Sequence, residues 1–174
     1  LGVYVFYIGI VMGAYGFLEP AVFSFLYPRM LQTYQMKEKE KYQKVLKELT
    51  ITTLVISLSL AVLIWFIAPF LIYWIDKPIY SIHVNELVWL IAAGFIHAVG
   101  YIPHYALYAM KGDKWIISAH ISSIMIFFLS LVLIPVENGI QAAVSALLFA
   151  FIWMLLIKTI GYGYTKKHST LLNT

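Results

Sequence analysis

Five apolar segments, each long enough to cross a lipid bilayer, constrain this chain more than any other feature of its sequence. A spanning helix needs about 20 mostly apolar residues, and the segments cover about 1–34, 49–75, 85–110, 115–134 and 139–160. Only 11% of the residues are charged, against roughly 25% in soluble proteins. Because backbone groups in hydrocarbon must satisfy one another, such segments form helices. The sequence therefore predicts an all-α integral membrane protein with five transmembrane helices.

The basic residues indicate which helix ends face the cytoplasm. When lysines and arginines in and beside the loops are counted, Lys77 stands alone on one side and the other eleven gather on the opposite side. Short cytoplasmic loops carry an excess of these residues. We therefore expect a cytoplasmic loop at 35–48 and a cytoplasmic tail at 161–174. With five spans, Leu1 then starts outside the cell.

The third segment carries polar side chains where lipid-facing residues would be apolar. On a helical period of 3.6 residues, one side of it holds Gly94, His97, Tyr101, His104 and Tyr108. Hydrocarbon offers their donors and acceptors no partners, so this side must face other helices or a wet cavity. Two interpretations of the histidines stay open: they line a polar cavity, or they form hydrogen bonds that pack helices together.

The first segment contains a carboxylate near its middle. Glu19 stands directly before a proline that is expected to kink the helix. At that depth a carboxylate costs several kcal/mol unless it is neutral, paired or hydrated. Tyr15, one turn earlier, is placed to hydrogen-bond it, so Glu19 has either a cavity or ion-coupling role or a structural one. Small residues predict a helix-packing seam on the same segment, at Gly9, Gly13 and Gly16.

Enzymatic chemistry finds little support in the sequence. The chain has no cysteine, and no third ligand stands near His97 and His104, so we expect no metal site. No glycine-rich phosphate loop, nucleophile elbow or carboxylate pair occurs. Glutamates interrupt the lysines of the first loop, which argues against nucleic-acid binding. We expect a protein that is not an enzyme and has no cofactor, although an integral-membrane glycan polymerase or acyltransferase fits the composition.

Short motifs occur in a fixed order along the whole chain. They are Leu1-Gly2-Val3-Tyr4, Tyr27-Pro28-Arg29, Ala68-Pro69-Phe70, Lys111-Gly112-Asp113-Lys114, and Ile134-Pro135 followed by Asn138-Gly139. In this order they resemble the C-terminal part of the polysaccharide-repeat flippases, the O-antigen and capsule branch of the multidrug/oligosaccharidyl-lipid/polysaccharide exporter superfamily. The sequence departs from the family pattern at Val136-Glu137-Asn138 and in the histidines of the third segment, which leaves the substrate class open.

The resemblance implies that the chain corresponds to about helices 8 to 12 of a twelve-helix, two-lobe transporter, with an N-terminal lobe before Leu1. It implies transport of an undecaprenyl-diphosphate-linked oligosaccharide from the inner to the outer leaflet, by alternating access, in a bacterial or archaeal cell membrane. The expected partners are the bilayer, the lipid-linked oligosaccharide and the missing N-terminal helices, with polysaccharide assembly proteins as further candidates. A multidrug or cation antiporter of the same superfamily and a non-transporting membrane scaffold are the alternatives.

A flippase of this kind needs a hydrated cavity with hydrogen-bond donors, positive charge for the diphosphate and aromatic faces for the sugars. Histidines supply donors that become cationic on protonation, and tyrosines supply hydroxyls and ring faces. A protonatable glutamate would couple transport to a proton or sodium gradient. An arginine at the inner mouth would either meet the diphosphate or anchor its helix at the interface. The candidate residues are Glu19, His97, His104, Tyr15, Tyr101, Tyr108 and Arg29.

Overall fold

The computed structural model describes residues 2–134 and 139–169, and every secondary-structure element in that part is a helix. Five helical stretches are long and apolar enough to cross a membrane: Gly2–Gln35, Lys39–Ile75, Val84–Ala109, Asp113–Leu133 and Gly139–His168. This confirms the predicted all-helical class with five membrane-spanning stretches. The predicted turn at 135–138, Leu1 and the final part of the expected tail, 170–174, lie outside the described residues.

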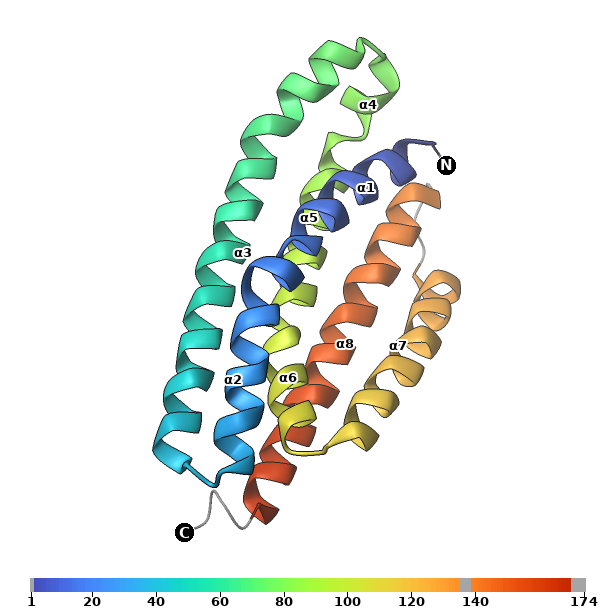
Figure 1. Ribbon diagram of the computed structural model, residues 1–174. Coiled ribbons are helices and arrows are strands. Elements are labelled where there is room, and N and C mark those ends of the chain that lie inside the picture. Colours follow the sequence, from blue (N-terminus) through green and yellow to red (C-terminus); the bar gives the residue numbers. More distant parts are fainter. Residues whose placement is uncertain (1, 135–138, 170–174) are drawn as a thin grey trace.

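The first spanning stretch is bent. It consists of α1 (Gly2–Gly16), a short π-helix (Glu19–Phe23) and α2 (Ser24–Gln35). In Figure 1, α1 leans across the bundle, whereas α2 runs alongside α3 (Lys39–Ile75). The bend falls where Pro20 removes a backbone donor, and both proline and π-turns are common causes of helix kinks.

The third spanning stretch is also interrupted. Helices α5 (Val84–Val99) and α6 (Tyr101–Ala109) meet at Gly100. Because Pro103 has no N–H, the carbonyl of Val99 loses its usual helical donor there. The polar side predicted for one continuous helix is therefore divided between two.

The interrupted third stretch occupies the middle of the bundle. Helices α2 and α3 pack on one side of α5 and α6, and α8 (Gly139–His168) packs on the other, with α7 (Asp113–Leu133) beside α8 (Figure 1). The short α4 (Pro78–Ile82) follows α3 and leads into α5. The stretch that carries His97 and His104 is thus the spanning stretch most enclosed by others, as the cost of exposing such groups to lipid demands.

Two helices extend beyond the apolar segments that predicted them. Helix α3 begins at Lys39, so that only 36–38 separate it from α2, where the sequence predicts a loop over 35–48. Helix α8 continues to His168, past the start of the tail expected at 161–174. The charged sequence at the start of α3 is rich in lysine, glutamate and glutamine, which are good helix formers, so this spanning helix carries on into it.

The turns that carry most of the basic residues lie at one end of the bundle, which we call the basic end. The α2–α3 turn, the α6–α7 turn and the end of α8 meet there, at the bottom of Figure 1. The α3–α4 turn with Lys77 lies at the opposite end. This separation agrees with the charge asymmetry from which we predict the orientation, and the assignment of the basic end to the cytoplasm stays a prediction.

The glycine seam predicted on the first segment contacts nothing in the described chain. Gly9, Gly13 and Gly16 are exposed, and no heavy atom lies within 4 Å of the position that a Cβ would take. Helix α1 instead packs on α5 through its other side, where a Cβ on Gly94 would stand 2.6 Å from a ring carbon of Tyr15. The predicted packing of this seam against another helix is therefore not met by the described helices of this chain.

Gly161 provides a test of how α8 packs on α7. A Cβ at Gly161 would stand 2.5 Å from Cγ and 2.6 Å from Cβ of Trp115, too close to the backbone of α7 for a cheap adjustment. We expect Gly161→Ala to destabilise the protein by about 1–3 kcal/mol, as overpacking does. Gly163→Ala on the same helix is the control, because nothing lies within 4 Å of its added Cβ. Thermal unfolding in detergent should show a lower Tm for Gly161→Ala alone, and equal Tm values would contradict this packing.

Candidate functional site

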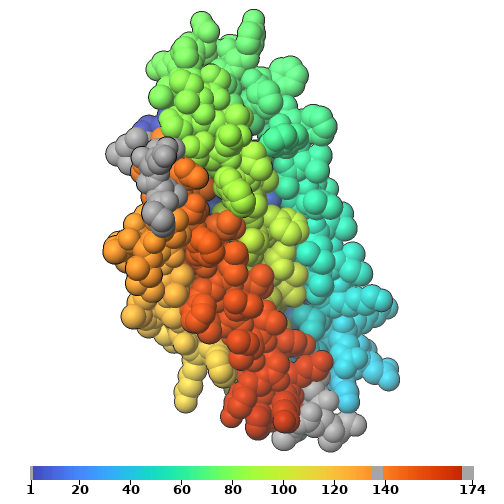
Figure 2. Space-filling model, turned by 180° about the vertical axis from the view of Figure 1, so that it is seen from behind, coloured from blue at the N-terminus to red at the C-terminus, as the bar shows by residue number. Residues whose placement is uncertain are grey.

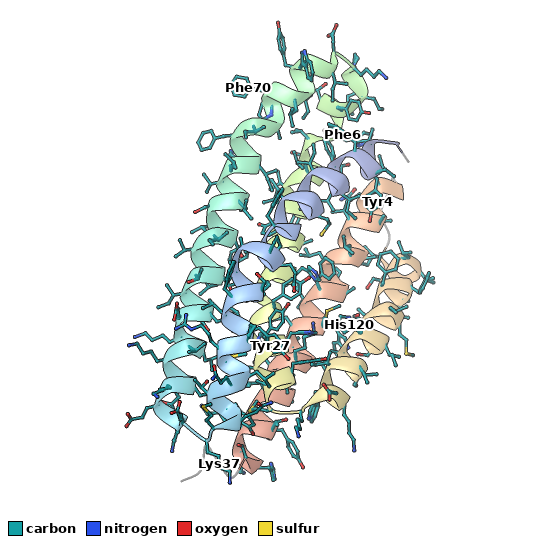
Figure 3. The ribbon with its side chains drawn as sticks, in the orientation of Figure 1. Tyr4, Phe6, Tyr27, Lys37, Phe70 and His120 are labelled. Atoms are coloured by element: carbon teal, nitrogen blue, oxygen red, sulfur yellow. The ribbon has the colours of Figure 1, made fainter. Side chains whose placement is uncertain are left out.

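Charged, imidazole and phenol side chains gather where the middle of the bundle meets its two flanks. We call this group the polar cluster. The residues come from the π-helix, α5, α6, α7 and α8, and they are Glu19, His97, Tyr101, His104, Tyr105, His120 and Lys158. Figure 3 shows Tyr27 and His120 at similar heights on either side of this region, with side chains crowded between them.

Three histidines of the cluster come from three different helices. The ring centroids of His104 on α6 and His120 on α7 are 6.1 Å apart. His97 on α5 has its ring centroid 5.1 Å from that of Tyr101 and 4.4 Å from that of Phe151 on α8. His104 Nδ1 is buried and has no hydrogen-bond partner among the described residues. The structure thus brings the predicted His97 and His104 together and adds His120, which the sequence did not single out.

Lys158 of α8 is the most costly member of the cluster. Its side chain is 2% exposed, and no carboxylate of the described residues lies within 4 Å of its ammonium group. Its charge acts on His97, His104 and His120. An unpaired ammonium in a low-dielectric interior costs several kcal/mol. The sequence pattern groups Lys158 with the basic residues beside the cytoplasmic loops, whereas the structure buries its side chain inside the bundle, ten residues before the end of α8.

Glu19 is held by Tyr105 of α6. The Tyr105 hydroxyl donates a 2.6 Å hydrogen bond to a carboxylate oxygen of Glu19. The hydrogen bond expected from Tyr15 to Glu19 is absent, because Tyr15 is buried between helices and donates to the backbone carbonyl of Ser57 at 3.3 Å. Glu19 itself is exposed on the bundle, and an exposed carboxylate inside a membrane requires water or another protein surface rather than lipid.

Aromatic rings form a continuous row beside the cluster. Neighbouring centroids are 5.6, 5.2, 4.7 and 5.0 Å apart along the row, which runs through Tyr108, Tyr27, Tyr105, Phe23 and Tyr101. These spacings lie within the favourable range for aromatic pairs. The predicted Tyr101 and Tyr108 therefore belong to one surface that joins α2 to α6, and Tyr108 at its end is 50% exposed.

Arg29 lies apart from the cluster, towards the basic end. Its guanidinium nitrogen is 3.3 Å from a carboxylate oxygen of Glu48, and both side chains are largely exposed. An exposed pair of this kind contributes about 0–1 kcal/mol. Its role in the structure is to connect α2 with α3.

Two residues of the polar cluster that were not predicted from the sequence, Tyr105 and Lys158, nevertheless fit the helical period. Tyr105 stands four residues after Tyr101, so it lies close to the polar side of the third segment. Lys158 continues a buried side of α8 that contains Ala150 and Met154, at four-residue intervals. That regular spacing was the available signal that Lys158 points into the bundle. Among the described residues, no three side chains of the metal-binding types come together to hold a metal ion.

Comparison with known proteins returned no match. No protein-family model matches the chain, and no curated protein and no solved structure matches it. The case for a function therefore depends on the chemistry of the polar cluster.

Tyr105→Phe should destabilise the protein by about 1 kcal/mol, because it removes the hydrogen bond to the Glu19 carboxylate. Tyr108→Phe is the matched control: it lies on the same helix and aromatic row and is half exposed. Denaturant or thermal unfolding of both variants in detergent checks the difference. If Tyr108→Phe costs as much stability as Tyr105→Phe, the hydrogen bond is not what holds Glu19.

Proposed function

We propose that this chain forms one lobe of a membrane transporter that moves an undecaprenyl-diphosphate-linked oligosaccharide from the inner to the outer leaflet by alternating access. The observation that carries the proposal is the buried side chain of Lys158, whose ammonium group has no carboxylate partner among the described residues. A charge held in this way is compensated when a substrate anion enters the cluster. A diphosphate provides that anion, and three neighbouring imidazoles provide further hydrogen-bond donors.

In the proposed transporter, the aromatic row binds the sugar part of the substrate. Sugar rings have apolar C–H faces that pack on aromatic rings, and their hydroxyls bond to phenol groups. Tyr27, Tyr101 and Tyr105 are only partly buried and lie next to the cationic part of the cluster. In the proposed transporter, the diphosphate meets Lys158 while the first sugars lie along this row.

Glu19 is suited to coupling transport to a proton or sodium gradient. It begins the π-helix at the bend of the first span, and Tyr105 ties it to the middle of the bundle. Protonation or sodium binding would remove the negative charge that strengthens this hydrogen bond. In our proposal, the loss of that charge loosens the bent span from α6 during alternating access.

A second lobe would cover the groups that this chain leaves open. The exposed carboxylate of Glu19 needs a polar environment, and the exposed seam of Gly9, Gly13 and Gly16 allows another helix to approach closely. Preceding helices of the same protein are the partner that we propose for this face.

The two alternative functions account less well for Lys158. A cation antiporter would place a positive charge where its substrate must bind, and Coulomb repulsion would oppose binding. A non-transporting scaffold would retain a costly charge that a methionine of similar length would replace with a gain in stability. We propose no catalytic reaction for the chain.

Lys158→Met is expected to change stability and transport in opposite directions. We expect the full-length gene product with this change to have a higher Tm in detergent, because a buried unpaired charge is replaced by an apolar side chain. In a strain that lacks its own repeat-unit flippase, we expect at least about tenfold less surface polysaccharide and an accumulation of lipid-linked precursor, since about 1.4 kcal/mol of lost binding already corresponds to tenfold.

Lys114→Gln is the control for the loss of a positive charge, because Lys114 is exposed at the start of α7. It should restore polysaccharide as well as the parent does, at equal amounts of inserted protein. Normal polysaccharide from the Lys158→Met protein would remove the substrate site. If the parent itself fails to restore polysaccharide but exports cationic compounds, the antiporter replaces the flippase.

Glu19→Gln tests the coupling role in the same strain. Glutamine retains an acceptor for Tyr105 but holds neither a negative charge nor an exchangeable acid proton. We expect surface polysaccharide to fall at least about tenfold while the amount of inserted protein stays normal. Full restoration by Glu19→Gln would keep the proposed transport and reduce Glu19 to a structural hydrogen-bond acceptor.

A further inference from the structure

A second polar site lies between the start of α3 and the end of α8, at the basic end. It is a pocket of about 420 Å³ whose lining includes Tyr42, Lys47, Thr50, Ile51, Tyr162 and Lys166. None of these residues belongs to the polar cluster. Figure 2 shows the face of the molecule on which the start of α3, in cyan, lies beside the end of α8, in red.

Tyr42 is part of the lining of this pocket, and its hydroxyl lacks a partner among the described residues. Its side chain is 1% exposed, and the hydroxyl oxygen is buried without a hydrogen bond to any described residue. The ring packs against Tyr34, with centroids 5.5 Å apart. A phenylalanine would keep that packing and avoid a buried unsatisfied group. The hydroxyl therefore indicates a ligand with an acceptor atom.

Two lysines line the pocket from opposite helices. Lys47 comes from α3 and Lys166 from α8, and no carboxylate of the described residues lies within 4 Å of either ammonium group. The Lys166 ammonium stands 5.9 Å from the ring centroid of Tyr162, which also lines the pocket. Two positive charges and a free hydroxyl donor suit an anion with several acceptor oxygens, and phosphate is such an anion.

The surface of α3 next to the pocket is an exposed apolar strip, which a free phosphate ion would not contact. Ile51, Leu54 and Leu58 follow Lys47 on the same helix side, at intervals of four, three and four residues. They are 50%, 39% and 58% exposed. A phosphate group beside an exposed apolar strip is the arrangement of a phospholipid at the membrane surface.

We infer that this pocket binds the headgroup phosphate of an anionic phospholipid whose acyl chains lie along Ile51, Leu54 and Leu58. Basic pockets between spanning helices at the membrane surface recognise anionic headgroups in this way. Lys47 and Lys166 contact the phosphate oxygens, and the Tyr42 hydroxyl donates to one of them. The inference is independent of the proposed transport function, because none of its residues belongs to the polar cluster.

The test measures lipid binding to the purified full-length protein in detergent, by native mass spectrometry and thermal unfolding. The probes are phosphatidylglycerol, phosphatidylcholine with the same acyl chains, and inorganic phosphate. We expect only phosphatidylglycerol to bind tightly and raise Tm. Lys47→Gln and Lys166→Gln should each weaken its binding about fivefold, and both together about thirtyfold.

Tyr42→Phe provides the sharper measurement, because its two expected effects differ in sign. Without lipid, its Tm should equal or exceed that of the parent, since an unsatisfied hydroxyl is removed. Its affinity for phosphatidylglycerol should nevertheless fall about tenfold, since a hydrogen bond to a charged group is lost. The matched control for the Lys47→Gln, Lys166→Gln double variant is Lys111→Gln with Lys114→Gln, which removes two lysines at the same end of the bundle but outside this pocket.

Two results would overturn the inference. One is that phosphatidylglycerol binds to Tyr42→Phe, and to the Lys47→Gln, Lys166→Gln double variant, as tightly as it binds to the Lys111→Gln, Lys114→Gln control. The other is that millimolar inorganic phosphate stabilises the parent as much as phosphatidylglycerol, which would make the pocket a site for small anions.

Discussion

A polar group that enters hydrocarbon must find its partner inside the bundle or in water, and this requirement arranges the whole protein. Tyr7 donates to the backbone carbonyl of Tyr80, Tyr15 to that of Ser57, and Tyr105 to the carboxylate of Glu19. Each bond joins two different spanning stretches or their connections. Polar side chains therefore act here as specific links between helices that apolar packing alone would leave free to slide.

The same requirement explains which helices lie inside. Helices α5 and α6 carry His97, His104 and most of the aromatic row, and they occupy the middle of the bundle. Helices α3 and α7 present long exposed apolar sides and lie at its flanks. Lys158 and Tyr42 are exceptions to the pattern of satisfied groups, and both proposed ligands, a diphosphate and a phospholipid headgroup, are anions that would supply the missing partners.

The number of spanning stretches and their helical type could be predicted from sequence because the backbone satisfies itself locally within each apolar segment. The bend at the π-helix was predicted from Pro20, whereas the break at Gly100 was not, although Pro103 weakens the helix there. The helix ends also differed. Helix α3 begins in the charged sequence at Lys39, where lysine and glutamate favour helix whether or not lipid surrounds them, and α8 continues through Gly161 and Gly163 to His168.

The candidate site was only partly predictable, since its members are selected by contacts between helices. His97 and His104 were found because two polar residues share one side of an apolar helix. Tyr15 was given the wrong partner because its hydroxyl reaches the neighbouring α3 rather than one turn along its own chain. Lys158 was missed because a lysine near the end of a span usually reaches the interface, and its four-residue spacing from Ala150 and Met154 was the one sign in the sequence that it turns inwards.

In the proposed transporter, the buried side chain of Lys158 also has an electrical consequence. It stands ten residues before the end of α8, so about 15 Å of helix separates it from that end. A charge inside the membrane would lie within the drop of the transmembrane potential, where a full crossing changes the energy of one elementary charge by about 2.3 kcal/mol per 100 mV. A motion of α8 along the membrane normal that carried this charge would then be biased by voltage, so the electric field across the membrane would be one of the forces acting on the proposed site.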